Sequence, residues 1–232
     1  MGTATPVRVE LTHGYQQQQD FGVLTAGTAA HTFRIAQKPD SSYEVVVDAT
    51  TGDVGSGLAL QRLASDGVTV LQSSLPVGGV GYSRSLRWIN ATGMMVGNEF
   101  VRVVSTSCGI PGCGPEDVYR LRAYDTTCVV PRFNNSATQV TILLLQNPTT
   151  HPVAGTIYFR TANGTLVGSQ AFSLSSEGTL ALNTSSVAGV AGQGGSITVA
   201  NDARYGELIG KAIALEPATG FTFDTPLTSR PR

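Results

Sequence analysis

The stretch DVYRLRAY, residues 117–124, alternates apolar and charged side chains at every second position. Successive side chains of a strand point to opposite sides, so Tyr119, Leu121 and Ala123 share one face and the two arginines share the other. A strand with one face in a core and one face in water has this pattern and is usually antiparallel. The stretch therefore predicts a half-buried antiparallel strand with a solvated arginine face.

The same period of two recurs along most of the 232 residues. It predicts strands at 31–35, 43–48, 58–62, 68–71, 85–90, 99–105, 117–124, 139–146, 155–161, 166–174, 179–183, 196–200, 208–215 and 221–224. Asp66-Gly67 and Asn163-Gly164 separate neighbouring strands and are typical hairpin turns. No helical period is sustained anywhere.

About seven strands in each half predict an all-β chain of two consecutive antiparallel β-sandwich domains, of jelly-roll or immunoglobulin-like type. The expected boundaries are a lead-in or linker at 1–19, a first sandwich at 20–128 and a second at 129–232. The polar segment before the first sandwich, which ends in four glutamines at 16–19, is expected to be a linker or an irregular lead-in strand around residues 7–11. Abundant glycine (27) and proline (11) fit many short strands joined by turns.

Charge and hydropathy exclude two classes of partner. The net charge is −1 and neither half carries a basic excess, so counterion release cannot supply affinity for nucleic acid. The longest dense apolar run, residues 140–145, is far shorter than the ~20 residues of a membrane-spanning helix, so no membrane insertion is expected. The first residues also lack the charged start and apolar stretch of a signal peptide.

The three cysteines leave several pairings open. Cys108 and Cys113 flank a glycine- and proline-rich loop, and a disulfide between them would close it. Cys128 could pair with one of the two instead, or all three could be free thiols. No zinc site is expected, because the chain has no further cysteine and no histidine lies near these three in the sequence.

Residues 20–125 resemble the bacterial pre-peptidase C-terminal domain. The resemblance rests on six stretches, which are Leu24–Gly27, Thr32–Ile35, Tyr43–Asp48, the Leu-x-Leu-x-Arg-Leu…Asp-Gly pattern of 58–67, and the late strands at 99–103 and 117–121. It implies a jelly-roll-like sandwich appended to secreted hydrolases, with roles in attachment, secretion or folding. Some members bind calcium, but here Gly52–Gly57 replaces the compact acidic pattern, and the insertion between Cys108 and Cys113 is also atypical.

Residues 206–226 are similar to the C-terminal β-sandwich of large secreted bacterial proteins, through the stretch GKAIALEPATGFTFDTP at 210–226. This likeness implies an extracellular or cell-surface location and no activity. The chain itself then belongs to a larger secreted protein.

The sequence shows no recognisable catalytic motif. A serine hydrolase needs a serine, a histidine and a carboxylate together, and no Gly-x-Ser-x-Gly elbow is present. His13, His31 and His151 lie in a polar lead-in, at a strand start and before a proline. Sixteen acidic residues allow many glycosidase pairs, and their spacing selects none. The chain is expected not to be an enzyme, and no catalytic residue is assigned.

Two further kinds of site have candidates. Asp48 and Asp53 border a glycine-rich connection whose carbonyl groups could help to hold calcium, although a solvated turn is the favoured explanation. Tyr82 and Tyr205 lie in glycine-flanked loops and are the candidate aromatic platforms for a ligand, whereas Trp88 alternates with Leu86 and is expected in the core. Otherwise no cofactor or metal is expected.

These observations favour a non-catalytic extracellular binding or accessory module that serves attachment or presentation. Its expected partners are a protein or polysaccharide surface, with self-association possible. The alternative is a structural protein that self-assembles by adding exposed edge strands to one another. An unrecognised hydrolase is the third hypothesis.

Overall fold

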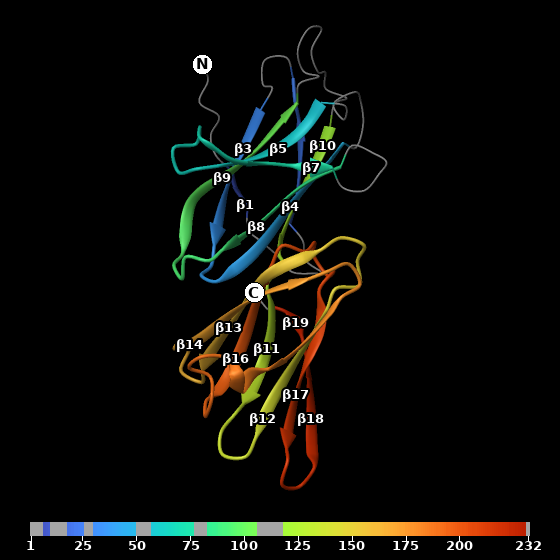
Figure 1. Cartoon of the computed structure of the whole chain (residues 1–232). Helices are drawn as coiled ribbons and strands as arrows, with labels where there is room; N and C mark the ends of the chain where they lie inside the picture. The colour runs from blue at the N-terminus through green and yellow to red at the C-terminus, as the bar shows by residue number, and fades with distance from the viewer. Residues whose placement is uncertain are drawn as a thin grey trace. The chain divides into compact units, whose positions relative to one another are not determined.

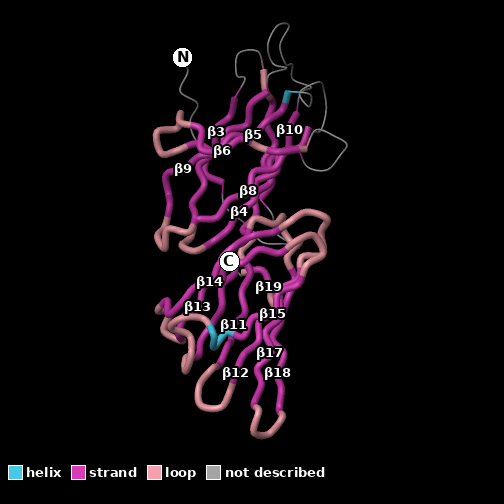
Figure 2. Tube along the Cα trace, viewed as in Figure 1, coloured by secondary structure: helices cyan, strands magenta, loops and turns pink. Residues whose placement is uncertain are grey.

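A computed structural model describes residues 7–9, 18–25, 30–49, 57–76, 83–105 and 118–230. These residues are almost entirely strands and connecting turns (Figures 1 and 2), which confirms the all-β prediction. One compact unit holds the described residues of Met1–Pro39, Glu44–Arg87 and Thr92–Tyr124, and the other holds Asp40–Tyr43, Trp88–Ala91 and Asp125–Arg232. Among the described residues, no helix is long and apolar enough to cross a membrane.

The described residues of the N-terminal sandwich form ten strands. They are β1 (Val7–Val9), β2 (Gln18–Val23), β3 (Ala30–Gln37), β4 (Ser41–Ala49), β5 (Leu58–Leu63), β6 (Val70–Ser73), β7 (Leu75–Pro76), β8 (Arg84–Asn90), β9 (Val96–Ser105) and β10 (Val118–Asp125). One sheet has the order β1-β3-β9-β5-β6 and the other has β2-β10-β4-β8-β7. β1 and β3 run parallel, whereas the pairs β2–β10, β3–β9, β5–β9, β5–β6 and β7–β8 are antiparallel.

The alternation that decided the fold is present in β10. Tyr119, Leu121 and Ala123 are buried in the core, which confirms the expected inward face. Trp88 is buried as predicted and packs against Tyr43, with their ring centroids 5.7 Å apart. The arginine face of β10 is half-buried rather than open to water, because its side chains bind a carboxylate described below.

The C-terminal sandwich follows in residues 128–229. Its elements are β11 (Cys128–Asn134), β12 (Val140–Gln146), β13 (Val153–Thr161), β14 (Leu166–Leu174), β15 (Thr179–Asn183), the short 3-10 helix η4 (Thr184–Ser186), β16 (Gly194–Asn201), β17 (Ile209–Glu216), β18 (Phe221–Pro226) and β19 (Thr228–Ser229). One sheet has the order β14-β13-β16-β11-β19 and the other has β15-β12-β17-β18. Between them lies a core in which Phe133 meets Phe159 edge to face at 5.5 Å.

Both predicted hairpin turns form. Gly67 and Gly164 have φ of 69° and 85°, a region that an L side chain rarely adopts. The Asp66 carboxylate also accepts hydrogen bonds from the backbone N–H groups of Val68 and Thr69, which fixes the first turn. The antiparallel pairs β5–β6 and β13–β14 extend from these turns.

Two segments differ from the sequence-based expectation. Gln18 and Gln19, expected in a linker, lie in β2 and pair with β10. Residues 128–134, at the expected domain boundary and without a predicted strand, form β11, which pairs with both β16 and β19. Neither segment alternates cleanly in sequence, so neither was predicted as a strand.

The chain enters and leaves the C-terminal sandwich at adjacent positions. Cys128 at the start of β11 lies opposite Ser229 in β19. The buried carboxylate of Asp125 accepts hydrogen bonds from Arg230 Nη2 at 2.5 Å and from the backbone N–H of Thr127 at 3.0 Å. A buried carboxylate needs such partners, so this ion pair fastens β19 to the start of the unit.

Gly155 provides a test of the C-terminal packing. A Cβ there would lie 2.2 Å from the backbone oxygen of Ala200 and 2.9 Å from Cα of Asn201. We expect Gly155→Ala to lower the free energy of unfolding by about 1–3 kcal/mol, because the neighbouring backbone must shift. Urea denaturation measures the change. Gly97→Ala, whose Cβ would meet nothing within 4 Å, is the matched control, and equal losses in both variants would contradict the prediction.

Candidate functional site

The β17–β18 hairpin presents large apolar side chains to solvent. Its register places Ala214 opposite Phe223 and Glu216 opposite Phe221, so these four side chains share the face that looks toward the other sheet. Phe221 and Phe223 are nevertheless 69% and 73% exposed. The facing alanine is small and the other sheet does not cover this end of the hairpin, so the rings remain in water.

A bulge in β11 forms the opposite wall. Val130 pairs with Ile197 and Phe133 with Gly195, which leaves one extra residue on β11. Pro131 lies within this bulge, where its missing N–H costs no ladder hydrogen bond. The bulge exposes Arg132 to solvent and keeps Phe133 in the core.

Between these walls lies a groove of about 280 Å³, slightly below the ~300 Å³ at which small-molecule pockets usually begin. We call it the hairpin groove. Its lining residues are Arg132, Phe133, Asn134, Gln139, Ala212, Ala214, Leu215, Glu216, Phe221, Phe223, Asp224 and Thr225. All of them belong to the C-terminal unit.

The charged groups of the hairpin groove have separate environments. Glu216 accepts a hydrogen bond from the Thr138 hydroxyl at 3.0 Å. Asp224 pairs with Lys211 at 2.5 Å on the other face of the hairpin, and Arg132 has no ion-pair partner among the described residues. The groove therefore combines an apolar platform with an acceptor and a free cation.

A second polar cluster lies in the N-terminal sandwich around Asp48. Its Oδ2 pairs with Arg120 at 2.9 Å and also with Arg122, and its Oδ1 accepts the Ser83 hydroxyl at 2.5 Å. Burial raises the pKa of Asp48, but the hydrogen bond from Ser83 and the two arginines outweigh it, so the pKa lies below its usual value. Two guanidinium groups already neutralise this carboxylate, which disfavours a calcium ion at Asp48.

Most other residues singled out from the sequence lie elsewhere. Asp53, Tyr82, Cys108, Cys113 and His13 fall outside the described residues, so the calcium, platform and disulfide predictions that involve them stay predictions. Tyr205 lies half-buried in the turn before β17 and does not line the hairpin groove. Within the described ranges, no three His, Cys, Asp or Glu side chains gather to hold a metal ion.

Cys128 is a free thiol in β11, so the alternative in which it pairs with another cysteine is not the arrangement in the structure. Its Sγ lies 3.6 Å from the backbone oxygen of Thr126. Burial, together with the charge of Asp125, raises the pKa of the thiol to about 12. The thiolate, which is the reactive form, is therefore almost absent near neutral pH.

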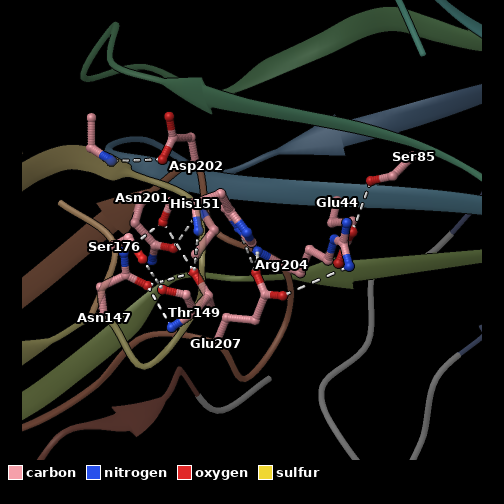
Figure 3. A network of polar contacts seen from close by, with 12 residues as sticks. Glu44, Ser85, Asn147, Thr149, His151, Ser176, Asn201, Asp202, Arg204 and Glu207 are labelled. Carbon is pink, nitrogen blue, oxygen red and sulfur yellow. Dashed lines mark hydrogen bonds and ion pairs between the residues drawn. The ribbon is translucent and has the colours of Figure 1, made fainter. Parts of the chain in front are cut away.

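His151 joins a network at one end of the C-terminal sandwich (Figure 3). Its Nε2 lies 3.3 Å from Glu207, which also accepts the backbone N–H of Arg204 at 2.8 Å. The nearby hydroxyls of Thr149 and Ser176 donate to oxygen atoms and not to the imidazole. The network fixes loops and holds no nucleophile–base pair.

His31, the other histidine among the described residues, also has a hydrogen-bond partner. Its Nδ1 lies 2.7 Å from the hydroxyl of Tyr119 on the facing sheet. The contact joins β3 to β10 across the sandwich.

Phe221 and Phe223 are the site residues that sequence reasoning missed. Their alternation with Thr222 and Asp224 indicates a strand with an apolar face, and such a face is normally buried. The exposure follows from the edge position of β18 and, for Phe223, from the small Ala214 opposite it, which only the strand order and register reveal. The alternation thus predicted a strand with an apolar face, but it could not show whether that face lies in the core or in solvent.

Comparison with known proteins adds little beyond the fold. No family model and no curated protein matches the chain. Among solved structures, the pre-peptidase C-terminal domain of a Bacillus anthracis collagenase is similar at a TM-score of 0.39 and 14% identity, over 53% of this chain and 98% of that one. This is a distant likeness to the family that the sequence resembles.

Two larger structures are also similar. A protein from Eubacterium rectale matches at a TM-score of 0.28 and 9% identity, over 91% of this chain and 74% of that one. A β-glucuronidase from Bacteroides uniformis matches at 0.20 and 11%, over 84% of this chain but 26% of that one. At such scores none of these likenesses carries an argument about activity.

The Asp48 cluster predicts a pH-dependent contribution to stability. A carboxyl group with a lowered pKa stabilises the fold above its ordinary value of 3.8, and the contribution is lost as pH falls through the lower value in the folded state. We expect Asp48→Asn to cost about 1–3 kcal/mol at pH 7 and progressively less below pH 4. Denaturation of both proteins across this range measures it. An equal difference at pH 3 and pH 7 would contradict the assignment.

Cys128 gives a second prediction. Because its pKa is raised to about 12, we expect it to resist alkylation by iodoacetamide at pH 8 in the folded chain and to react after unfolding in urea. Peptide-resolved mass spectrometry separates it from the other two cysteines. Alkylation of folded Cys128 at the rate of a free model thiol would contradict the burial of this side chain and its raised pKa.

Proposed function

We propose that the chain is a non-catalytic accessory module of a larger secreted or surface protein, and that it attaches this protein to an extracellular polysaccharide. The observation that carries the proposal is the pair Phe221 and Phe223, which stay exposed beside the hairpin groove. Exposed apolar patches of this kind mark interaction sites on otherwise polar surfaces.

The chemistry of the hairpin groove suits a sugar chain. The apolar C–H face of a sugar ring packs on an aromatic ring, as the phenylalanines permit, while its hydroxyl groups need donors and acceptors at the rim. Arg132 supplies donors and Glu216 supplies acceptors there. A groove of about 280 Å³ accommodates a small part of an extended chain, which is typical of attachment rather than of enclosure for catalysis.

The engagement of titratable groups supports a non-catalytic role. Glu99 binds Arg62, Asp125 binds Arg230 and Glu207 contacts His151. These side chains hold strands and loops together and do not converge on the hairpin groove. Among the residues that line the groove, Glu216 and Asp224 lie on opposite faces of the hairpin, so they do not form the facing carboxylate pair of a glycosidase.

The extracellular location rests on the sequence. Residues 20–125 resemble the pre-peptidase C-terminal domain, which is appended to secreted hydrolases. The presentation of a neighbouring enzyme near its insoluble substrate is the role that this resemblance implies. The alternative, a self-assembling structural protein, is favoured by a different feature, the open edge of β18.

Binding to insoluble polysaccharides tests the proposal. We expect the chain to co-sediment with at least one of cellulose, chitin, peptidoglycan and starch granules, and F221A/F223A to lower the affinity at least tenfold, because the apolar platform is lost. Leu166→Ala, which removes an exposed apolar side chain of β14, is the matched control. Melting temperatures verify that each variant folds.

Three results would overturn it. The chain could bind none of the four polymers, the double variant could bind as well as the parent, or binding could occur only to a collagen-coated surface. The last outcome would make a protein the partner.

A further inference from the structure

Strand β18 has an open edge. Within the described part of the chain its one neighbour is β17, so the other side of its backbone carries unpaired N–H and C=O groups. Such an edge is a template for another strand. The edge lies in the plane of the sheet and is therefore distinct from the face that carries the two phenylalanines.

The register determines which residues point their backbone groups outward. The N–H of Leu227 bonds the backbone oxygen of Gly210 at 3.0 Å and continues the β17–β18 register. Hydrogen-bonded positions alternate along an antiparallel ladder, so Phe223 and Thr225 also face β17. Thr222 and Asp224 then direct both their N–H and C=O groups to the open edge.

We propose that a second copy of this chain occupies this edge, with the two β18 strands antiparallel about a two-fold axis at Phe223. In this register Thr222 lies opposite Asp224 of the second copy, and the reverse pair is identical. Both are hydrogen-bonded positions, so four backbone hydrogen bonds form. Phe223 lies opposite Phe223 of the second copy in the position between them, where Cβ atoms are about 4.5–5.5 Å apart.

Charge selects this register over its neighbours. A shift by two residues in one direction sets Asp224 against Asp224 and requires an N–H from Pro226, which has none. The opposite shift sets Asp224 against Gly220, which lies in the hairpin turn at φ 72°. In the proposed register each Asp224 meets a threonine hydroxyl, and Lys211 already balances its charge.

The pairing also continues the apolar platform. Phe221 and Phe223 of both copies lie on one face, so two hairpin grooves adjoin and a sugar chain could contact both. A ladder of about five residues buries less than the ~1,000 Å² of a stable interface, so the dissociation constant is expected at about micromolar to millimolar. The association itself does not depend on the proposed polysaccharide binding.

Sedimentation velocity between about 10 µM and 1 mM tests the association. We expect a concentration-dependent dimer, its loss in Thr222→Pro, and its retention in Thr222→Ala. Proline removes the outward N–H without touching the bonds to β17, whereas alanine keeps it. Thr222→Pro keeps both phenylalanines, so its monomer should still bind polysaccharide, which separates failure of the dimer from failure of the proposed function.

A disulfide tests the register. With Cys108 and Cys113 replaced by serine, Phe223→Cys should form a covalent dimer under mild oxidation, because the two positions face each other across the axis. In this register Thr225 lies opposite Phe221 of the second copy and not opposite Thr225, so Thr225→Cys should cross-link at least tenfold more slowly. A chain that stays monomeric at 1 mM, Thr222→Pro that dimerises like the parent, or equal cross-linking at both positions would overturn the proposal. If a strand of another protein binds the β18 edge instead, the chain alone stays monomeric and the proposed dimer is wrong.

Discussion

The two-sided geometry of a pleated strand is the constraint on which this structure depends. It divides β10 into a core face, with Tyr119 and Leu121, and a polar face whose arginines bind Asp48. It also places Phe221 and Phe223 together on one side of β18. The same constraint thus produces a closed core in one sandwich and an open aromatic groove in the other, and the difference comes from what lies opposite each face.

Sequence pattern was sufficient wherever the side chains alternate. Residues 166–174 and 179–183 form strands with the predicted bounds, and the turns at Gly67 and Gly164 follow from glycine's access to positive φ. Strands β2 and β11 were not predicted, because their glutamines and their proline give no period of two. Both pair with strands distant in sequence, β2 with β10 and β11 with β16 and β19, and a local pattern does not reveal such partners.

The candidate site was less accessible to sequence reasoning than the fold. Exposure of Phe223 depends on Ala214 beside it and on the edge position of β18, neither of which a single segment reveals. The partners of Asp48 come from β10 and from Ser83 before β8, so its role as an ion-pair centre was also hidden. The face and the edge of one hairpin then offer two separate modes of contact, one through side chains and one through the backbone.

The adjacency of Cys128 and Ser229 has a mechanical consequence. Tension carried along the chain would enter the C-terminal unit through β11 and leave through β19, two strands that are antiparallel neighbours. Such a pull peels their hydrogen bonds apart one after another instead of shearing them together. The ion pair between Asp125 and Arg230 and the backbone hydrogen bond from Arg230 to Thr127 are then the first contacts to bear the load.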